Sequence, residues 1–118
     1  MSPAAREPVA VGVLGATGTV GSRLVRMLAD HPWFRLEEVA ASERSAGTPL
    51  GSLVDPDVAG ALPERVAGLR VTSTDGPFSA PLLFSALPSS VAREAEAAAA
   101  RAGHLVVSNA SAYRADAD

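Results

Sequence analysis

Glycine recurs at every third position near the start of the chain, at Gly12, Gly15, Gly18 and Gly21. A dinucleotide-binding loop needs one glycine for a tight turn, one so that the backbone can approach the diphosphate, and one for close packing of a helix on a strand. The helix that follows offers free N–H groups to phosphate. Residues 15–21 therefore predict a site for the diphosphate of a nicotinamide dinucleotide; the alternative is a glycine-rich turn without a ligand. The expected contact residues are Gly15, Thr17, Gly18, Thr19 and Val20.

A second polar cluster, at residues 42–47, follows the next predicted strand. An NAD-selective site usually places an acidic residue here to bind the ribose hydroxyls. This chain offers Ser42, Arg44 and Ser45, and a guanidinium pairs in bidentate fashion with phosphate. Glu43 either binds a ribose hydroxyl or points into solvent beside Arg44. We expect NADP in preference to NAD, and the alternative is a solvated loop of mixed charge.

Strands and helices must bring these loops together. Residues 9–14 are apolar apart from one glycine, which is typical of a strand buried on both faces. Residues 20–30 predict a helix that ends before Pro32. Its predicted apolar stripe consists of Val20, Leu24, Val25, Met27 and Leu28. Further strands are predicted at 34–41, 69–73, 81–85 and 104–108, a helix at 91–102, and an irregular connection with one short helical turn at 48–68.

Helices that alternate with buried strands predict an α/β fold: a single domain with a Rossmann-like parallel sheet and helices on both faces. Ligands bind such sheets at the carboxyl ends of the strands. We expect a flexible N-terminus at 1–8, a dinucleotide-binding domain at 9–114 and a tail at 115–118. The polar segments expected to converge are 15–21, 42–47, 85–88 and 108–114.

The composition excludes several kinds of site. With 47% hydrophobic residues and a net charge of -3, the chain of 118 residues suits a single globular domain and gives no support for nucleic-acid binding. All ten basic residues are arginine, so no lysine can form a Schiff base. No cysteine is present, which excludes disulfides, thiolate metal sites and a cysteine nucleophile. Without a signal peptide or an apolar run that could cross a membrane, we expect a cytoplasmic protein with no metal.

A serine nucleophile would need a base within hydrogen-bond reach. The candidate hydroxyls are Ser85, Ser108 and Ser111, and the histidines of the sequence are His31 and His104. His31 precedes a proline at a helix end, and His104 opens a strand after a glycine. Both positions favour structural roles, so no catalytic residue is assigned.

Four blocks in this order resemble the aspartate-β-semialdehyde dehydrogenase family, in its archaeal and fungal-like branch. The blocks are residues 11–21, 41–47, 84–88 and 108–114. The resemblance implies that Ser42, Arg44 and Ser45 bind the 2′-phosphate of NADP. It further implies that Asn109 borders the active site and that Arg114 binds phosphate or an acyl-phosphate group. The residues implied to line the path to the nicotinamide ribose are Ser85, Ala86, Leu87 and Pro88.

The sequence departs from that family in one respect. Family members carry a second domain with a catalytic cysteine, and this sequence ends before it. The resemblance therefore implies the NADP-binding half of an oxidoreductase of amino-acid biosynthesis that acts on aldehyde groups, inactive by itself. Partners would be a separate catalytic chain or a second copy, meeting at an exposed apolar edge. The alternatives are a non-catalytic nucleotide-binding or regulatory module, a remnant, or the same half of an N-acetyl-γ-glutamyl-phosphate reductase-like enzyme.

Overall fold

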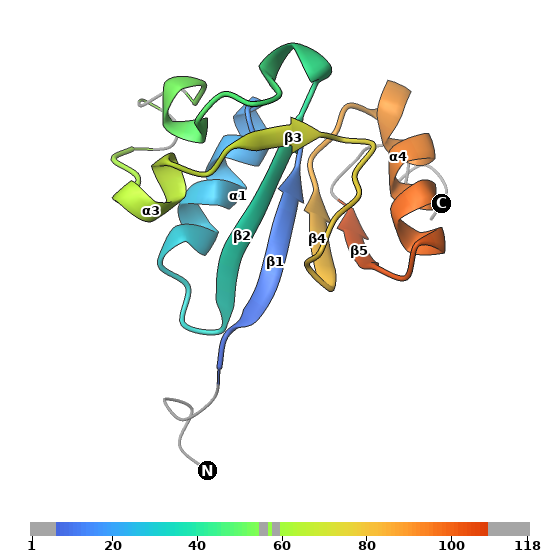
Figure 1. Ribbon diagram of the computed structural model, residues 1–118, viewed down its shortest axis with the longest axis horizontal. Helices are drawn as coiled ribbons and strands as arrows, with labels where there is room; N and C mark the ends of the chain where they lie inside the picture. The colour runs from blue at the N-terminus through green and yellow to red at the C-terminus, as the bar shows by residue number, and fades with distance from the viewer. Residues whose placement is uncertain (1–6, 55–56, 58–59, 109–118) are drawn as a thin grey trace.

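A computed structural model describes residues 7–54, 57 and 60–108. In this part of the chain five strands form one sheet in the order β3-β2-β1-β4-β5, and all neighbouring strands run parallel (Figure 1). The predicted Rossmann-like α/β fold is confirmed. The strands are β1 (Val9–Leu14), β2 (Phe34–Ala41), β3 (Val71–Ser73), β4 (Leu82–Ser85) and β5 (Leu105–Ser108). The helices are α1 (Thr19–Ala29), α3 (Glu64–Ala67) and α4 (Ser89–Arg101), with 3₁₀ turns η2 (Glu43–Ser45) and η3 (Leu50–Ser52).

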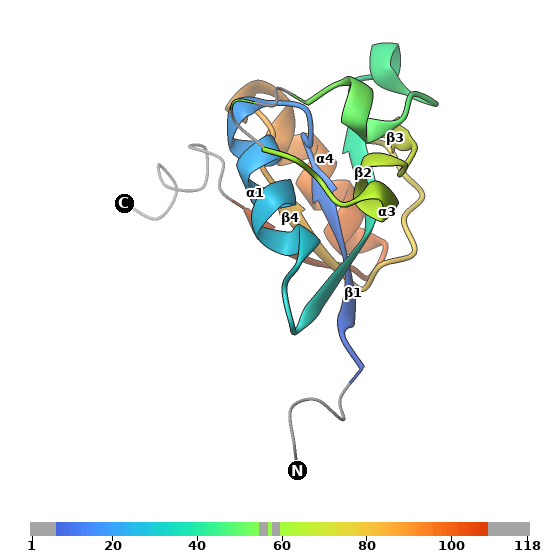
Figure 2. The same cartoon turned by 90° about the vertical axis from the view of Figure 1, so that its left-hand side faces the viewer.

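Helices cover both faces of the sheet, as Figure 2 shows for α1 and α4. The side chains of β1 alternate between the two layers, because successive residues of a strand point to opposite faces. Val11 and Val13 pack with Val25 of α1 in the larger core cluster. Leu14 packs on the opposite face with Ala92 of α4. The two crossovers, β1-α1-β2 and β4-α4-β5, thereby place the carboxyl ends of all five strands at one edge.

The inward face of α1 differs from the predicted apolar stripe. Val20 and Met27 are 43% and 67% exposed, whereas Val25 and Leu28 are buried. The buried line instead begins at Gly21 and Ser22. Small residues there let the first turn approach the sheet closely, so the helix is rotated toward them and away from Val20. The prediction was wrong for two of the five stripe residues.

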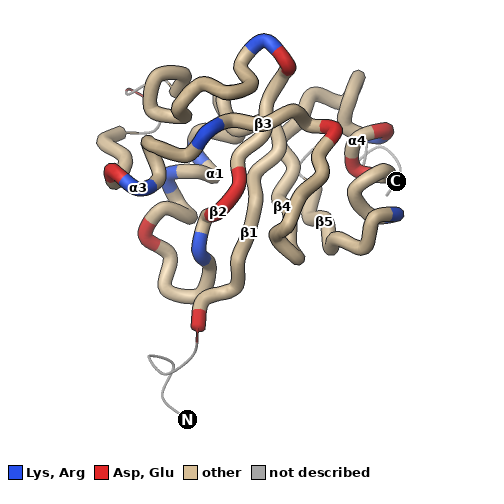
Figure 3. The backbone as a smooth tube through the Cα atoms, viewed as in Figure 1, with Lys and Arg blue, Asp and Glu red and all other residues tan. Residues whose placement is uncertain are grey.

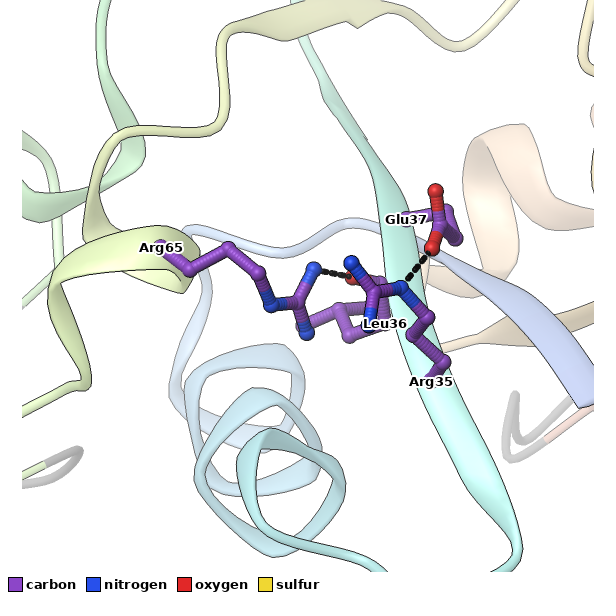
Figure 4. A network of polar contacts seen from close by, with 4 residues as sticks. All are labelled: Arg35, Leu36, Glu37 and Arg65. Atoms are coloured by element: carbon purple, nitrogen blue, oxygen red, sulfur yellow. Dashed lines mark hydrogen bonds and ion pairs between the residues drawn. The ribbon is translucent and has the colours of Figure 1, made fainter. Parts of the chain in front are cut away.

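Among the described residues of the predicted irregular connection at 48–68, both η3 and α3 are helical turns, where one was predicted. Leu50 and Val66 anchor these turns in the larger core cluster. Arg65 of α3 donates a hydrogen bond of 2.9 Å to the carbonyl oxygen of Leu36 in β2 (Figure 4). β3 pairs only with the last three residues of β2. The guanidinium therefore donates a hydrogen bond to a part of β2 that does not pair with β3. Figure 4 also shows an exposed ion pair between Arg35 and Glu37.

Two side chains fix the segment that leads into β4. The Glu38 carboxylate of β2 accepts hydrogen bonds from the backbone N–H groups of Ser79, at 2.8 Å, and Ala80, at 2.7 Å. On the other side His104 Nδ1 lies 2.6 Å from the carbonyl oxygen of Ala80. Because a carbonyl only accepts, this nitrogen carries the proton. The structural role predicted for His104 is thereby borne out by its contact.

Candidate functional site

The loop between β1 and α1 is held by backbone hydrogen bonds. The N–H groups of Gly15 and Ala16 both donate to the carbonyl oxygen of Ala40, at 2.8 and 3.0 Å. Gly15 has a φ of +79°, a conformation that L side chains rarely adopt. The Ser22 hydroxyl donates to the carbonyl oxygen of Ala16 at 3.2 Å. Hydrogen bonds within the protein therefore fix the conformation of this turn.

The glycines at 18 and 21 differ in what surrounds them. A Cβ on Gly21 would lie 1.8 Å from the carbonyl oxygen of Gly15, so only glycine allows α1 to pack on the loop at this point. A Cβ on Gly18 would meet nothing closer than that same oxygen at 3.6 Å. Gly21 thus serves packing, whereas Gly18 leaves an open surface.

The start of α1 is suited to an anion. The first intrahelical hydrogen bond runs from the N–H of Ser22 to the carbonyl oxygen of Gly18. The N–H groups of Thr19, Val20 and Gly21 come before it and have no acceptor within the helix. The first turn carries no acidic residue. These donors and the helix dipole together favour a bound phosphate.

A cleft of about 610 Å³ opens over this helix start. It collects residues from the carboxyl ends of β1, β2, β3 and β4, which is the edge predicted to hold the ligand. Most of its lining residues are apolar or glycine, and four carry hydroxyl groups, a composition typical of a cofactor site. Its lining consists of Gly15, Thr17, Gly18, Thr19, Val20, Ala41, Ser42, Thr74, Ala86, Leu87, Pro88 and Val91.

Some residues named from the sequence lie elsewhere. Arg44 and Ser45 belong to η2, beside the cleft-lining Ser42, and do not themselves line the cleft. Figure 3 shows the acidic and basic positions of η2 side by side above the carboxyl ends of the strands. Asn109 and Arg114 lie outside the described residues.

Ser85 is fully buried and does not line the cleft. Leu83 packs against Ala99 of α4, and Ser85, two residues on in the same strand, points to that same face. Glu96 of α4 is also buried and accepts a 2.8 Å hydrogen bond from the hydroxyl of Ser108. The expected position of Ser85 at a strand end is correct, but the helix above it separates its hydroxyl from the cleft.

The sequence reasoning missed three cleft residues: Ala41, Thr74 and Val91. Thr74 directly follows β3, so the rule that ligands bind at carboxyl ends could have found it. Val91 belongs to the first turn of α4, and only the packing of that helix brings it to the cleft. The interior of the cleft therefore depends on elements far apart in the sequence.

Neither histidine forms a catalytic pair with a described serine. His31 Nδ1 accepts a hydrogen bond of 3.1 Å from the backbone N–H of Trp33, and its ring packs on Phe34. His104 contacts the carbonyl oxygen of Ala80, as described above. Ser111 lies outside the described residues. Both histidines therefore contact backbone groups and aromatic rings.

Comparison with known proteins agrees with this architecture. A family model described as the NAD binding domain of semialdehyde dehydrogenase matches residues 10–118. An aspartate-semialdehyde dehydrogenase of Archaeoglobus fulgidus is 50% identical over 88% of this chain and 31% of its own length. A malonyl CoA reductase (NADP) of Metallosphaera sedula is 37% identical over 96% of this chain and 32% of its own length.

A solved structure shares the fold closely. The crystal structure of aspartate semialdehyde dehydrogenase with NADP from Candida albicans superposes with a TM-score of 0.84, at 36% identity over 90% of this chain and 30% of that chain. The chain thus spans about a third of the length of the relatives it matches. No helix in the described ranges is long and apolar enough to cross a lipid bilayer. The family match over almost the whole sequence, on a fold of the same topology, shows that the chain belongs to the semialdehyde dehydrogenase NAD-binding domain family.

Proposed function

We propose that this chain binds NADP(H) in the cleft and supplies the cofactor-binding part of an aspartate-semialdehyde dehydrogenase-like oxidoreductase. One observation carries the proposal: the free N–H groups at the start of α1 lie at a cleft lined by the open surface of Gly18. Thr17, Thr19 and the backbone of the loop would hold the diphosphate. When bound, the nicotinamide ring supplies a hydride acceptor or donor.

The 2′-phosphate of the adenosine would lie at η2. Ser42 lines the cleft, and Arg44 follows it on an exposed turn. In the described part of the chain the Arg44 guanidinium makes no hydrogen bond or ion pair, whereas that of Arg70 donates to the carbonyl oxygen of Gly47. A guanidinium whose N–H groups have no acceptor among the described residues, next to a serine hydroxyl, is suited to bind phosphate. The NADP named with the Candida structure and with the Metallosphaera relative supports the same cofactor.

Titration of the purified chain with NADPH and with NADH, followed by calorimetry, tests both parts of the proposal. We expect Arg44→Ala to weaken the binding of NADPH by about tenfold, because one charge-assisted contact is lost. The affinity for NADH should stay unchanged. Arg101→Ala, which removes the same charge at the far end of α4, is the matched control. Unchanged NADPH affinity in Arg44→Ala would reject the 2′-phosphate assignment. A chain that binds neither dinucleotide would reject the proposed function.

An exposed apolar surface lies at the β5 side of the sheet. Leu105 and Val107 of the edge strand β5 are 67% and 48% exposed. Their register partners Leu82 and Phe84 are only partly buried and pack toward the α1 side of the core. This open half-face of the sheet, formed by these four residues, is apolar and borders β5, the end strand of the sheet among residues 7–108 as far as they are described. We infer that it receives the catalytic part of the enzyme, in the same polypeptide or in another.

Catalysis requires that further part, because the sequence contains no cysteine for the thioester that the family resemblance implies. We expect the chain alone not to turn over aspartate semialdehyde with phosphate and NADP. Turnover should return when a polypeptide that carries the missing cysteine is added. Turnover by the chain alone would contradict this part of the proposal.

A further inference from the structure

Three residues of the cleft lining have no role in the contacts described above. If the diphosphate lies at the start of α1 and the 2′-phosphate at Ser42, the base must lie beyond the ribose they share. The lining residues that are not assigned to the diphosphate, the 2′-phosphate or the nicotinamide ribose are Ala41, Thr74 and Val91. These mostly apolar side chains are suited to the two faces of a purine. This step rests on the proposed function.

A neighbouring hollow of about 270 Å³ lies between the β3–β4 connection and α4. Thr74 and Val91 line both the cleft and this hollow, so the two adjoin at these residues. The hollow adds the carboxylates of Asp75 and Glu94 and no basic residue. A base held against Thr74 and Val91 would lie next to these acidic groups.

The turn that carries Asp75 is fixed by its own hydrogen bonds. The N–H of Asp75 donates to the Ser73 hydroxyl at 3.2 Å, and the N–H of Gly76 donates to the Ser73 carbonyl oxygen at 3.2 Å. Asp75 also follows Thr74 directly, so it is joined to a residue that lines the cleft. Glu94 extends from α4 instead, one turn beyond Val91.

We propose that Asp75 accepts a hydrogen bond from the exocyclic amine of adenine and makes the site selective for a 6-aminopurine. An ionised carboxylate only accepts hydrogen bonds, and the 6-amino group donates them. A 6-oxopurine presents an acceptor oxygen at the same position, which leaves two acceptors facing each other. A site that pairs with a polar group of its ligand discriminates well against an analogue that lacks that group.

The test compares NADPH with its hypoxanthine analogue, in which an oxygen replaces the 6-amino group and every phosphate and ribose is retained. We expect the full chain to bind NADPH about tenfold more tightly, as for one charge-assisted hydrogen bond. In Asp75→Asn the amide both donates and accepts, so the preference should fall to about threefold or less. Glu94→Gln removes the same charge from the same hollow and should keep the preference of the unmodified chain.

The outcomes separate the two proposals. If the unmodified chain binds neither dinucleotide, the proposed function fails, and this inference fails with it. If it binds both equally, or if Asp75→Asn keeps the full preference, the inference about Asp75 is overturned while NADP binding stands. If the preference disappears in Glu94→Gln instead, the carboxylate that reads the base is not Asp75. Thermal unfolding of each variant checks that it folds, and Asp75 and Glu94 are exposed, so we expect unchanged stability.

Discussion

Substitution of Gly21 by alanine separates what the glycine loop needs for folding from what it needs for binding. Helix propensity alone predicts that Gly21→Ala stabilises α1 by about 1 kcal/mol. The new Cβ, however, would lie 1.8 Å from the Gly15 carbonyl oxygen, 2.7 Å from the Gly15 carbonyl carbon and 3.0 Å from the Ala16 Cα. All three are backbone atoms, so no side-chain rotation relieves the contact and the loop or the helix must shift.

We expect a net destabilisation of about 3 kcal/mol, the upper range for overpacking a close contact. For a chain of this length that lowers the midpoint of thermal unfolding by about 12 °C. The displaced loop should also lose NADPH affinity. Circular dichroism during heating and calorimetric titration measure the two effects.

Gly18→Ala is the matched control. Its Cβ would find its nearest neighbour at 3.6 Å, and the φ of -77° at Gly18 suits alanine. Stability should fall by less than about 1 kcal/mol, the difference between glycine and alanine at a helix N-cap. The methyl group would extend into the cleft and weaken NADPH binding. If Gly21→Ala unfolds at the same temperature as the unmodified chain, or Gly18→Ala is the less stable variant, the assignment of packing to Gly21 and ligand contact to Gly18 is wrong.

Substitutions at three further positions test contacts of the fold and its open surface. Arg65→Ala removes the hydrogen bond to the Leu36 carbonyl and should cost about 1–2 kcal/mol in urea unfolding, with NADPH affinity unchanged; no loss would show that solvent replaces the guanidinium. Glu38→Ala leaves two amides without their carboxylate and should cost about 2–3 kcal/mol, whereas Glu38→Gln should cost less because one acceptor oxygen remains. The open half-face predicts that the chain self-associates at high concentration when its catalytic part is absent. Leu105→Glu should then restore a monomer in light scattering, and a monomeric unmodified chain would count against this surface as an interface.

The sequence by itself determined the region from β1 to α1. The apolar run of residues 9–14, the glycines that follow and the helix start are consecutive, so their spacing already specifies strand, turn and phosphate-binding helix end. The order of strands and helices also predicted the parallel sheet with helices on both faces, because right-handed crossovers leave few other topologies. The β2–β3 connection was less predictable, since η3 and α3 are stabilised by Leu50 and Val66 in a distant core.

Only the tertiary structure decided which side chains reach the cleft. Thr74 and Val91 come from different elements, and no local pattern places them beside Gly18. Ser85 has the right position along its strand, but its side chain points to the face that α4 covers, so it is buried. Likewise, Val20 was predicted both to contact the diphosphate and to pack on the sheet; it lines the cleft and does not pack on the sheet, because the closest approach of α1 occurs at Gly21. Sequence periodicity gives the spacing of residues along a helix or strand. The rotation of a helix about its axis, and which of its side chains become buried, depend on the elements that pack against it.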